Sequence, residues 1–485
     1  MSPFKLYQFI ASNYAWINLI LVGLVIYMGR HKSSRSTMIW LMALALFPVI
    51  GFIPYLLMGK DTRRRNMFRL KAEQDKYVQR ETALQWMEIS ESQREGIRPG
   101  FEDYSELIGL NLRLDRSVVT TDNEVRIFTD GASKFHTLLE DIENAHATIE
   151  MQYYIVKSDR LGKAVMDALI RAAKRGVKIR FLTDGLGGRD LKKSDVNRLR
   201  AAGVHTAEFF PSLLSIINLR MNYRNHRKLV IIDDKIGYIG GFNVGDEYVG
   251  RYPRFGNWRD THLRIDGGAT VDLKIRFLMD WYYASGEDPA EEPDIKPQGN
   301  PEGNIPCQLV TSGPDTEYPN IKYALIKMIQ SANHEIYIQT PYFIPDATVM
   351  EILLVAIQQG VKVNLMIPDR PDHPVVYPAT LSHAGELIRH GASVYRYEGG
   401  FLHSKVILID DFISMVGSAN VDERSFSLNF EASEIVYSKK INRRLRRAFE
   451  EDVRKSTLLT AEVYEKRSLW MKIRQPLCRL ASPIL

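Results

Sequence analysis

The chain has 485 residues, enough for two or three domains with large cores. Lysine and arginine outnumber aspartate and glutamate by 64 to 58, a net charge of +6, which favours an anionic partner without choosing between nucleic acid and anionic lipid. The two cysteines, Cys307 and Cys478, match no metal-ligand spacing and fit a reducing compartment, with a single disulfide left open.

The first 60 residues contain two stretches without charge, 6–29 and 36–59, each 24 residues long. About 20 apolar residues cross the hydrocarbon core of a bilayer, so residues 1–60 are predicted to form a transmembrane helical hairpin. The alternatives are a buried core helix and a signal peptide, although a signal peptide has a shorter apolar core. More lysine and arginine flank the hairpin than lie in its connecting loop, which places both ends of the chain in the cytoplasm.

Residues 61–109 follow as a charged juxtamembrane segment that is poor in glycine and proline. We expect a helix whose basic beginning lies against anionic headgroups, each cation contributing about 1 kcal/mol near such a surface. Beyond Lys71 an ordinary solvated helix fits the sequence equally well.

From residue 110 strands alternate with helices, and the same order occurs twice. In the first half, 110–284, helices are predicted over 135–145, 164–175 and 195–202, and strands over 148–154 and 177–182. The second half, 307–485, repeats them as helices over 324–332, 352–359 and 385–390 and strands over 335–339 and 361–367. Residues 285–306 hold five prolines and are predicted to be the linker. The pattern predicts two duplicated α/β domains related by a pseudo-twofold axis, each a mostly buried sheet flanked by helices.

Four polar residues recur at identical offsets in the two halves. His226, Lys228, Asp233 and Asn243 are matched 177 residues later by the second set, which consists of His403, Lys405, Asp410 and Asn420. An apolar stretch follows each lysine, as expected of a strand buried on both faces. The repetition predicts one catalytic half-site that has been duplicated.

The spacing assigns different roles to these residues. Side chains at positions i and i+2 of a strand share a face, so each histidine projects together with its lysine. Each aspartate stands at an odd offset, faces away from the histidine, and is expected to support the site through hydrogen bonds. The asparagines follow Gly-Gly or Gly-Ser, small residues that allow close approach.

Two histidines, two lysines and two asparagines suit the transfer of a phosphoryl group. Ammonium groups and amides can stabilise its distributed charge. One histidine can attack phosphorus while the other protonates the leaving oxygen, through a phosphohistidine. We expect no metal or other cofactor, because the sequence has neither paired acids suited to Mg²⁺ nor a glycine-rich nucleotide loop. The remaining histidines, among them His205, His262, His383 and His390, are interpreted as structural or surface residues.

These paired motifs resemble the HKD motifs of the phospholipase D superfamily. Further segments are similar to its bacterial cardiolipin synthase branch, namely 221–225, 245–248, 258–262, 339–345, 422–426 and the two N-terminal spans. The resemblance implies two phospholipase D-like domains and a bacterial inner-membrane protein. It also implies transfer of a phosphatidyl group from one phosphatidylglycerol to another, giving cardiolipin and glycerol, with His226 as nucleophile and His403 as acid and base. The near symmetry of the sequence leaves that order open.

Other functions remain to be distinguished. A phospholipase that uses water, or a transferase that uses another alcohol, needs the same residues. A nuclease needs no membrane hairpin, so we expect no nucleic acid partner, and a non-catalytic scaffold needs no intact motifs. The oligomeric state is not predicted.

The apolar stretch 209–220 precedes the first motif. It fits a buried core segment or a loop that dips into the bilayer, with Arg220 and Arg224 binding the charge of the lipid.

Overall fold

The computed structural model describes residues 3–29, 34–47, 51–52, 55, 104–211, 223–254, 256–287, 299–370, 372–480 and 482. Three predicted segments therefore lie wholly or largely outside the described residues. They are the juxtamembrane segment up to residue 103, most of the apolar stretch before the first motif (212–222, with Arg220), and the middle of the proline-rich linker (288–298).

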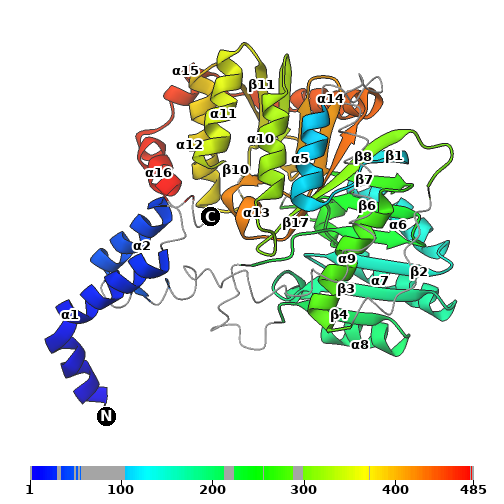
Figure 1. The fold of residues 1–485 in the computed structure, drawn as a ribbon, viewed down its shortest axis with the longest axis horizontal. Coiled ribbons are helices and arrows are strands. Elements are labelled where there is room, and N and C mark those ends of the chain that lie inside the picture. Colours follow the sequence, from blue (N-terminus) through cyan, green and yellow to red (C-terminus); the bar gives the residue numbers. More distant parts are fainter. Residues whose placement is uncertain are drawn as a thin grey trace.

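Two N-terminal helices, α1 (Pro3–Gly29) and α2 (Ser34–Leu46), extend from the rest of the molecule (Figure 1). Val25, Trp40 and Leu44 are buried against one another, while other apolar side chains such as Trp16 and Ile20 are exposed. Within the described residues, no helix is both long enough and apolar enough to span a bilayer.

The remaining chain is built on one large sheet with the strand order β18-β12-β11-β9-β14-β15-β17-β8-β1-β7-β6-β5-β2-β3-β4. Outward from the β8–β1 pair, equivalent strands of the two halves follow in the same order on either side, as a pseudo-twofold axis between β8 and β1 requires. The first-half strands are β1 (Thr120–Asp130), β2 (Thr148–Tyr153), β3 (Lys178–Asp184), β4 (His205–Phe209), β5 (Leu229–Ile232), β6 (Ile236–Gly240) and β7 (Trp258–Asp266). Their counterparts are β8 (Ile305–Ser312), β9 (Glu335–Gln339), β11 (Lys362–Pro368), β12 (Ser393–Tyr397), β14 (Val406–Ile409), β15 (Ile413–Gly417) and β17 (Glu431–Tyr437), with β18 (Ser456–Leu458) at the edge.

The sequence predicts a separate sheet in each half, and the structure joins the two. Strands β1 and β8 pair antiparallel, with Thr120 opposite Cys307 and Asn123 opposite Ile305. The Asn123 amide also donates to the Ile305 carbonyl over 3.0 Å. The pairing removes the exposed edge that each half would otherwise have.

Helices cover both faces of the sheet (Figure 1). Those of the first half are α6 (Gly131–Glu143), α7 (Arg160–Lys174), α8 (Lys193–Ala201) and α9 (Thr270–Ser285). Those of the second half are α10 (Asn320–Gln330), α11 (Ala347–Gln358), α12 (Val376–Arg389), α13 (Glu423–Ser427) and α14 (Lys439–Val453). Two further helices, α15 (Ala461–Glu465) and α16 (Leu469–Leu480), pack on α12. Helix α5 (Ser105–Asp115) precedes β1 in the chain but packs on the second half, where the Asn111 amide donates to Gln308 of β8.

Local sequence signals explain where these helices begin and end. Asp159 and Asp346 cap α7 and α11, accepting from the backbone N–H groups three residues on. Gly176 and Gly360 follow these helices at φ 96° and 92°, a conformation that a side chain would disfavour. Helix α12 begins nine residues before the predicted start, and Pro378 is compatible with this because it stands in the first turn, where proline is tolerated.

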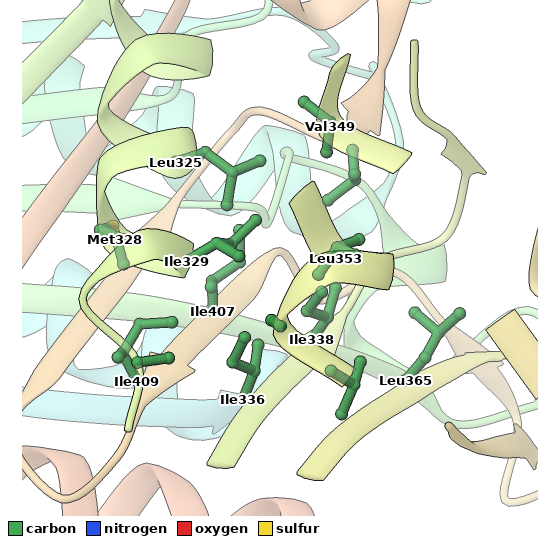
Figure 2. Close-up of a cluster of buried hydrophobic side chains, with 14 of the residues drawn as sticks. Leu325, Met328, Ile329, Ile336, Ile338, Val349, Leu353, Leu365, Ile407 and Ile409 are labelled. Carbon is green, nitrogen blue, oxygen red and sulfur yellow. The ribbon is translucent and has the colours of Figure 1, made fainter. Parts of the chain in front are cut away.

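Apolar side chains from helices and strands interlock to form the core of the second half. Figure 2 shows Leu325, Met328 and Ile329 of α10 pointing toward Ile336 and Ile338 of β9. All five are at most 2% exposed, and full burial of such a side chain stabilises the fold by about 1.5–3 kcal/mol. This packing fixes β9 and its neighbour β14, the strand that follows the second histidine.

Candidate active site

Both motif histidines lie in short extended segments just before β5 and β14, and each segment pairs with the opposite half. The His226 N–H donates to the Phe430 carbonyl over 2.9 Å, and the His403 N–H donates to the Arg259 carbonyl over 2.7 Å. Residues Phe401–Leu402 form strand β13, which runs parallel to the start of β7. The backbone of one half therefore sets the position of the histidine in the other.

A carboxylate from the opposite half holds each histidine. His403 Nδ1 lies 2.6 Å from Asp260 Oδ2 of β7, and His226 Nδ1 lies 3.1 Å from Glu431 Oε1 of β17. Both carboxylates are fully buried, whereas the side chains of His226 and His403 are 24% and 17% exposed. Because Nδ1 is engaged, Nε2 of each imidazole is the nitrogen available to a substrate.

Several further donors surround Glu431. Its carboxylate accepts from Ser418 over 2.5 Å, and from Ser425 and Asn429 over 3.2 Å each. Burial opposes ionisation of this acid, but His226, Lys228 and the Ser418 hydroxyl together hold its pKa below the usual value. Glu431 is therefore an anion at neutral pH, able to stabilise a positive charge on His226.

The two motif lysines are buried beside the histidines. Each ammonium donates to the backbone carbonyl of its own motif histidine. Burial lowers the pKa of Lys228, and burial together with Lys228 lowers that of Lys405 to about 7. Burial and the neighbouring Lys405 likewise lower the pKa of His403 to about 4, against the opposing effect of Asp260. The charged groups of the two halves thus act on one another within a single site.

The motif aspartates lie away from this site. The Asp233 carboxylate accepts from the backbone N–H groups of residues 146, 147 and 148 at 2.7–2.9 Å. Asp410 makes the equivalent bonds to residues 333, 334 and 335. Both aspartates have positive φ, 52° and 49°, in the turn after the strand. Each fixes the end of the motif strand to the beginning of the neighbouring strand, β2 or β9, so neither touches the reacting groups.

The side chains of the two motif asparagines, Asn243 and Asn420, form hydrogen bonds within their own halves. Asn243 accepts from the Ile155 N–H over 3.0 Å and lies 3.3 Å from the Tyr248 hydroxyl. The Asn420 amide donates to Asp422 over 3.0 Å, and its buried Oδ1 has no hydrogen-bond partner among the described residues.

Of the two arginines predicted to bind lipid, Arg220 lies outside the described residues. Arg224 is 5% exposed, its Nη1 lies 3.9 Å from Asp184, and its Nε has no partner among the described residues. The centroids of the Tyr154 and His226 rings lie 4.2 Å apart. Burial raises the pKa of Tyr154 to about 12, and the nearby charges of Arg224 and Arg424 both act to lower it. These cations therefore lie near the first histidine.

Sequence reasoning missed Asp260 and Glu431 as functional residues. They stand 34 and 28 residues after the histidine of their own half, so the repeat spacing does not align them, and only pairing between the halves brings each to its histidine. Both acids lie in strands that hold several other polar residues, Trp258–Asp266 and Glu431–Tyr437, so neither stands out as a polar exception in an apolar run. No group of three His, Cys, Asp or Glu side chains in the described ranges is arranged to hold a metal ion.

The family model for the cardiolipin synthase, phospholipase D-like domain matches residues 138–252 and 325–453, and the phospholipase D-nuclease N-terminal model matches residues 14–60. The major cardiolipin synthase ClsA of Bacillus subtilis is 47% identical over 97% of both chains. A cardiolipin synthase of Oceanobacillus iheyensis is 45% identical over 97% of both chains, and one of Staphylococcus aureus is 44% identical over 97% of this chain and 95% of its own.

Among solved structures, the phosphatidylserine synthase of Haemophilus influenzae shares the fold. Its TM-score is 0.61 at 13% identity, and the match covers 78% of this chain and all of the other. The duplicated motifs, the shared site and the full-length similarity agree: the chain belongs to the phospholipase D-like cardiolipin synthase family.

Proposed function

We propose that this protein synthesises cardiolipin by transferring a phosphatidyl group from one phosphatidylglycerol to another, with release of glycerol. The observation that carries the proposal is the pair of histidines, each bonded at Nδ1 to a buried carboxylate of the opposite half, with two buried lysines beside them. Two imidazoles and two ammonium groups suit exchange of one phosphodiester for another.

In the first step, Nε2 of His226 attacks phosphorus of the donor lipid. The bond from phosphorus to the glycerol headgroup breaks, and His403 gives its proton to the departing oxygen. Glu431 stabilises the positive charge that forms on His226. A phosphodiester bound between the lysines offsets their charges and raises the pKa of His403 from about 4 toward the range of a general acid.

In the second step, a hydroxyl of the acceptor phosphatidylglycerol replaces the departed glycerol. His403, now neutral, removes the hydroxyl proton as the oxygen attacks phosphorus and the bond to His226 breaks. The products are cardiolipin and the original pair of imidazoles. Asp260 holds the His403 ring in one orientation through both steps.

Arg224 and Arg424 supply positive charge next to this site. The acceptor lipid brings a second phosphodiester of its own, and water does not. Arginine near the first histidine therefore favours an anionic alcohol as acceptor over hydrolysis.

The N-terminal region places the enzyme at its substrate. We propose that residues 1–60 anchor the chain in the bacterial inner membrane as a hairpin, with the catalytic domains on the cytoplasmic side. The charge-free stretches 6–29 and 36–59 and the exposed apolar side chains of α1 support this anchoring.

Incubation of the full-length protein in vesicles with phosphatidylglycerol labelled in its headgroup and acyl chains tests the proposal. We expect cardiolipin and free labelled glycerol in equal amounts. Phosphatidic acid as the main product would identify a hydrolase, and transfer only to an added alcohol would identify a different transphosphatidylase.

A further inference from the structure

The last helix, α16, carries its apolar side chains outward. Its exposed residues include Leu469 at 74%, Trp470 at 66%, Ile473 at 51%, Leu477 at 62% and Leu480 at 66%. At about 100° per residue, these five positions fall within an arc of about 100° on the helix. They form one continuous stripe, named the α16 stripe below.

The opposite face of α16 is the one that packs on the protein, and its contacts are largely polar. Gln475 is 2% exposed and accepts from the Tyr464 hydroxyl over 3.0 Å. Arg479 forms a 2.6 Å ion pair with Glu386 of α12, and Arg474 donates to the Pro374 carbonyl. A helix on the surface of a soluble protein ordinarily shows the reverse arrangement, with its apolar face inward.

The charge of this segment is also one-sided. Residues 466–485 contain five cations, Lys466, Arg467, Lys472, Arg474 and Arg479, and no acidic residue. A helix with tryptophan and leucine on one face and lysine and arginine around it is typical of segments that lie in the interface of an anionic bilayer.

We propose that the α16 stripe inserts into the headgroup region of an anionic phospholipid bilayer, as a second membrane contact at the opposite end of the chain from α1. In the view of Figure 1, α16 lies at the periphery of the second half, on the side toward which α1 and α2 extend. A second copy of the chain is a less suitable occupant, because docking of two copies through this stripe would bring two sets of like charges together. Contact at both ends of the chain restrains the catalytic domains close to the surface that holds their substrate.

A fluorescent label on the stripe tests the contact without requiring turnover. In full-length protein carrying Cys478→Ser, an environment-sensitive dye is attached to Ile473→Cys, while Cys307 is buried and stays unlabelled. The matched control is Val355→Cys on α11, because Val355 is 53% exposed and lies on another helix of the same half. We expect emission from position 473 to move to shorter wavelength in vesicles containing phosphatidylglycerol, and emission from position 355 to stay unchanged.

Two outcomes would overturn the proposal. Emission at 473 could remain that of an aqueous dye in the vesicles. Emission that depends on protein concentration, with crosslinks between copies, would identify a second copy as the occupant.

A stability measurement complements the label. Ile473→Ser combined with Leu477→Ser should leave the Tm in detergent unchanged, because both side chains are exposed there. A large fall in Tm would mean that the stripe is covered within the protein. The inference relies on the proposed function only for the anionic nature of the membrane, and an inactive enzyme that still shows the shift would refute the function alone.

Discussion

The two half-sites share their motif but differ in how the histidine is held. Asp260 reaches His403 directly at 2.6 Å and otherwise accepts from the Thr261 N–H next to it. Glu431 has a longer side chain, lies 3.1 Å from His226 and is bound by two serines and an asparagine. A duplicated motif therefore produces two environments, and the difference provides a physical basis for dividing nucleophile and acid–base roles between identical side chains.

Removing either imidazole should have the largest effect. His226→Ala and His403→Ala should each reduce synthesis by about 10⁴-fold or more, because neither half-site can perform both roles. Only the variant that keeps the nucleophile should accumulate a phosphatidyl-enzyme, detected by mass spectrometry after rapid quenching. Accumulation in His226→Ala would exchange the proposed roles, and near-normal synthesis in either variant would contradict the two-histidine scheme.

Neutralising Asp260 and Glu431 one at a time distinguishes the roles of the two half-sites. Asp260→Asn and Glu431→Gln should each lower kcat by roughly 10²–10⁴-fold with little change in Tm. Asp260 raises the pKa of His403, so its loss lowers that pKa further and moves the His403-dependent limb of the pH–rate profile to lower pH.

The control for this shift is the other acid. Glu431→Gln should leave the His403 limb in place, because Glu431 contacts the other histidine. Identical profiles for the two variants would mean that the acids have only a structural role.

Gly241 and Ser418 occupy equivalent positions in the two motifs, beside Asp260 and Glu431 respectively. Substitutions at these positions test the space around each acid. A Cβ on Gly241 would lie 2.0 Å from Asp260 Oδ1, so Gly241→Ala must displace the carboxylate that holds His403. We expect kcat to fall by more than about tenfold, by the same loss of orientation. Ser418→Ala removes one hydrogen bond to Glu431 and the acceptor of the Ala432 N–H, and should lower kcat only several-fold. Equal effects in steady-state assays would argue against different constraints in the two halves.

The motif aspartates should affect activity least. Asp233→Ala and Asp410→Ala each leave three backbone N–H groups without their acceptor, which should lower the free energy of unfolding by about 2–4 kcal/mol. Because neither carboxylate reaches the site, kcat of the folded fraction should stay within about twofold of wild type. A large loss of kcat with unchanged denaturant stability would give these residues a direct part in the reaction.

The sequence predicted the duplicated α/β halves and the strands β5 and β14, because an apolar run of four residues next to a repeated motif has few alternatives. The odd offset of Asp233 also predicted the direction of its side chain correctly, away from His226. The joining of the two sheets was missed, since pairing of β1 with β8 depends on backbone edges that carry no sequence pattern. The acids Asp260 and Glu431 were missed for the same reason, because contacts between the halves leave no periodic signal.

Each half supplies the carboxylate that holds the histidine of the other half, and this arrangement has a consequence for biosynthesis. The His403–Asp260 contact joins residues 143 positions apart, and the His226–Asn429 contact joins residues 203 positions apart. Contacts of such sequence separation form late in folding, because the intervening chain must first be ordered. While the ribosome is still making the second half, the first half lacks the Glu431 carboxylate for its histidine and lacks the second lysine, Lys405, of the complete site. A nascent or truncated chain at the membrane is therefore unable to cleave the lipids around it, and catalytic competence appears only with the completed fold.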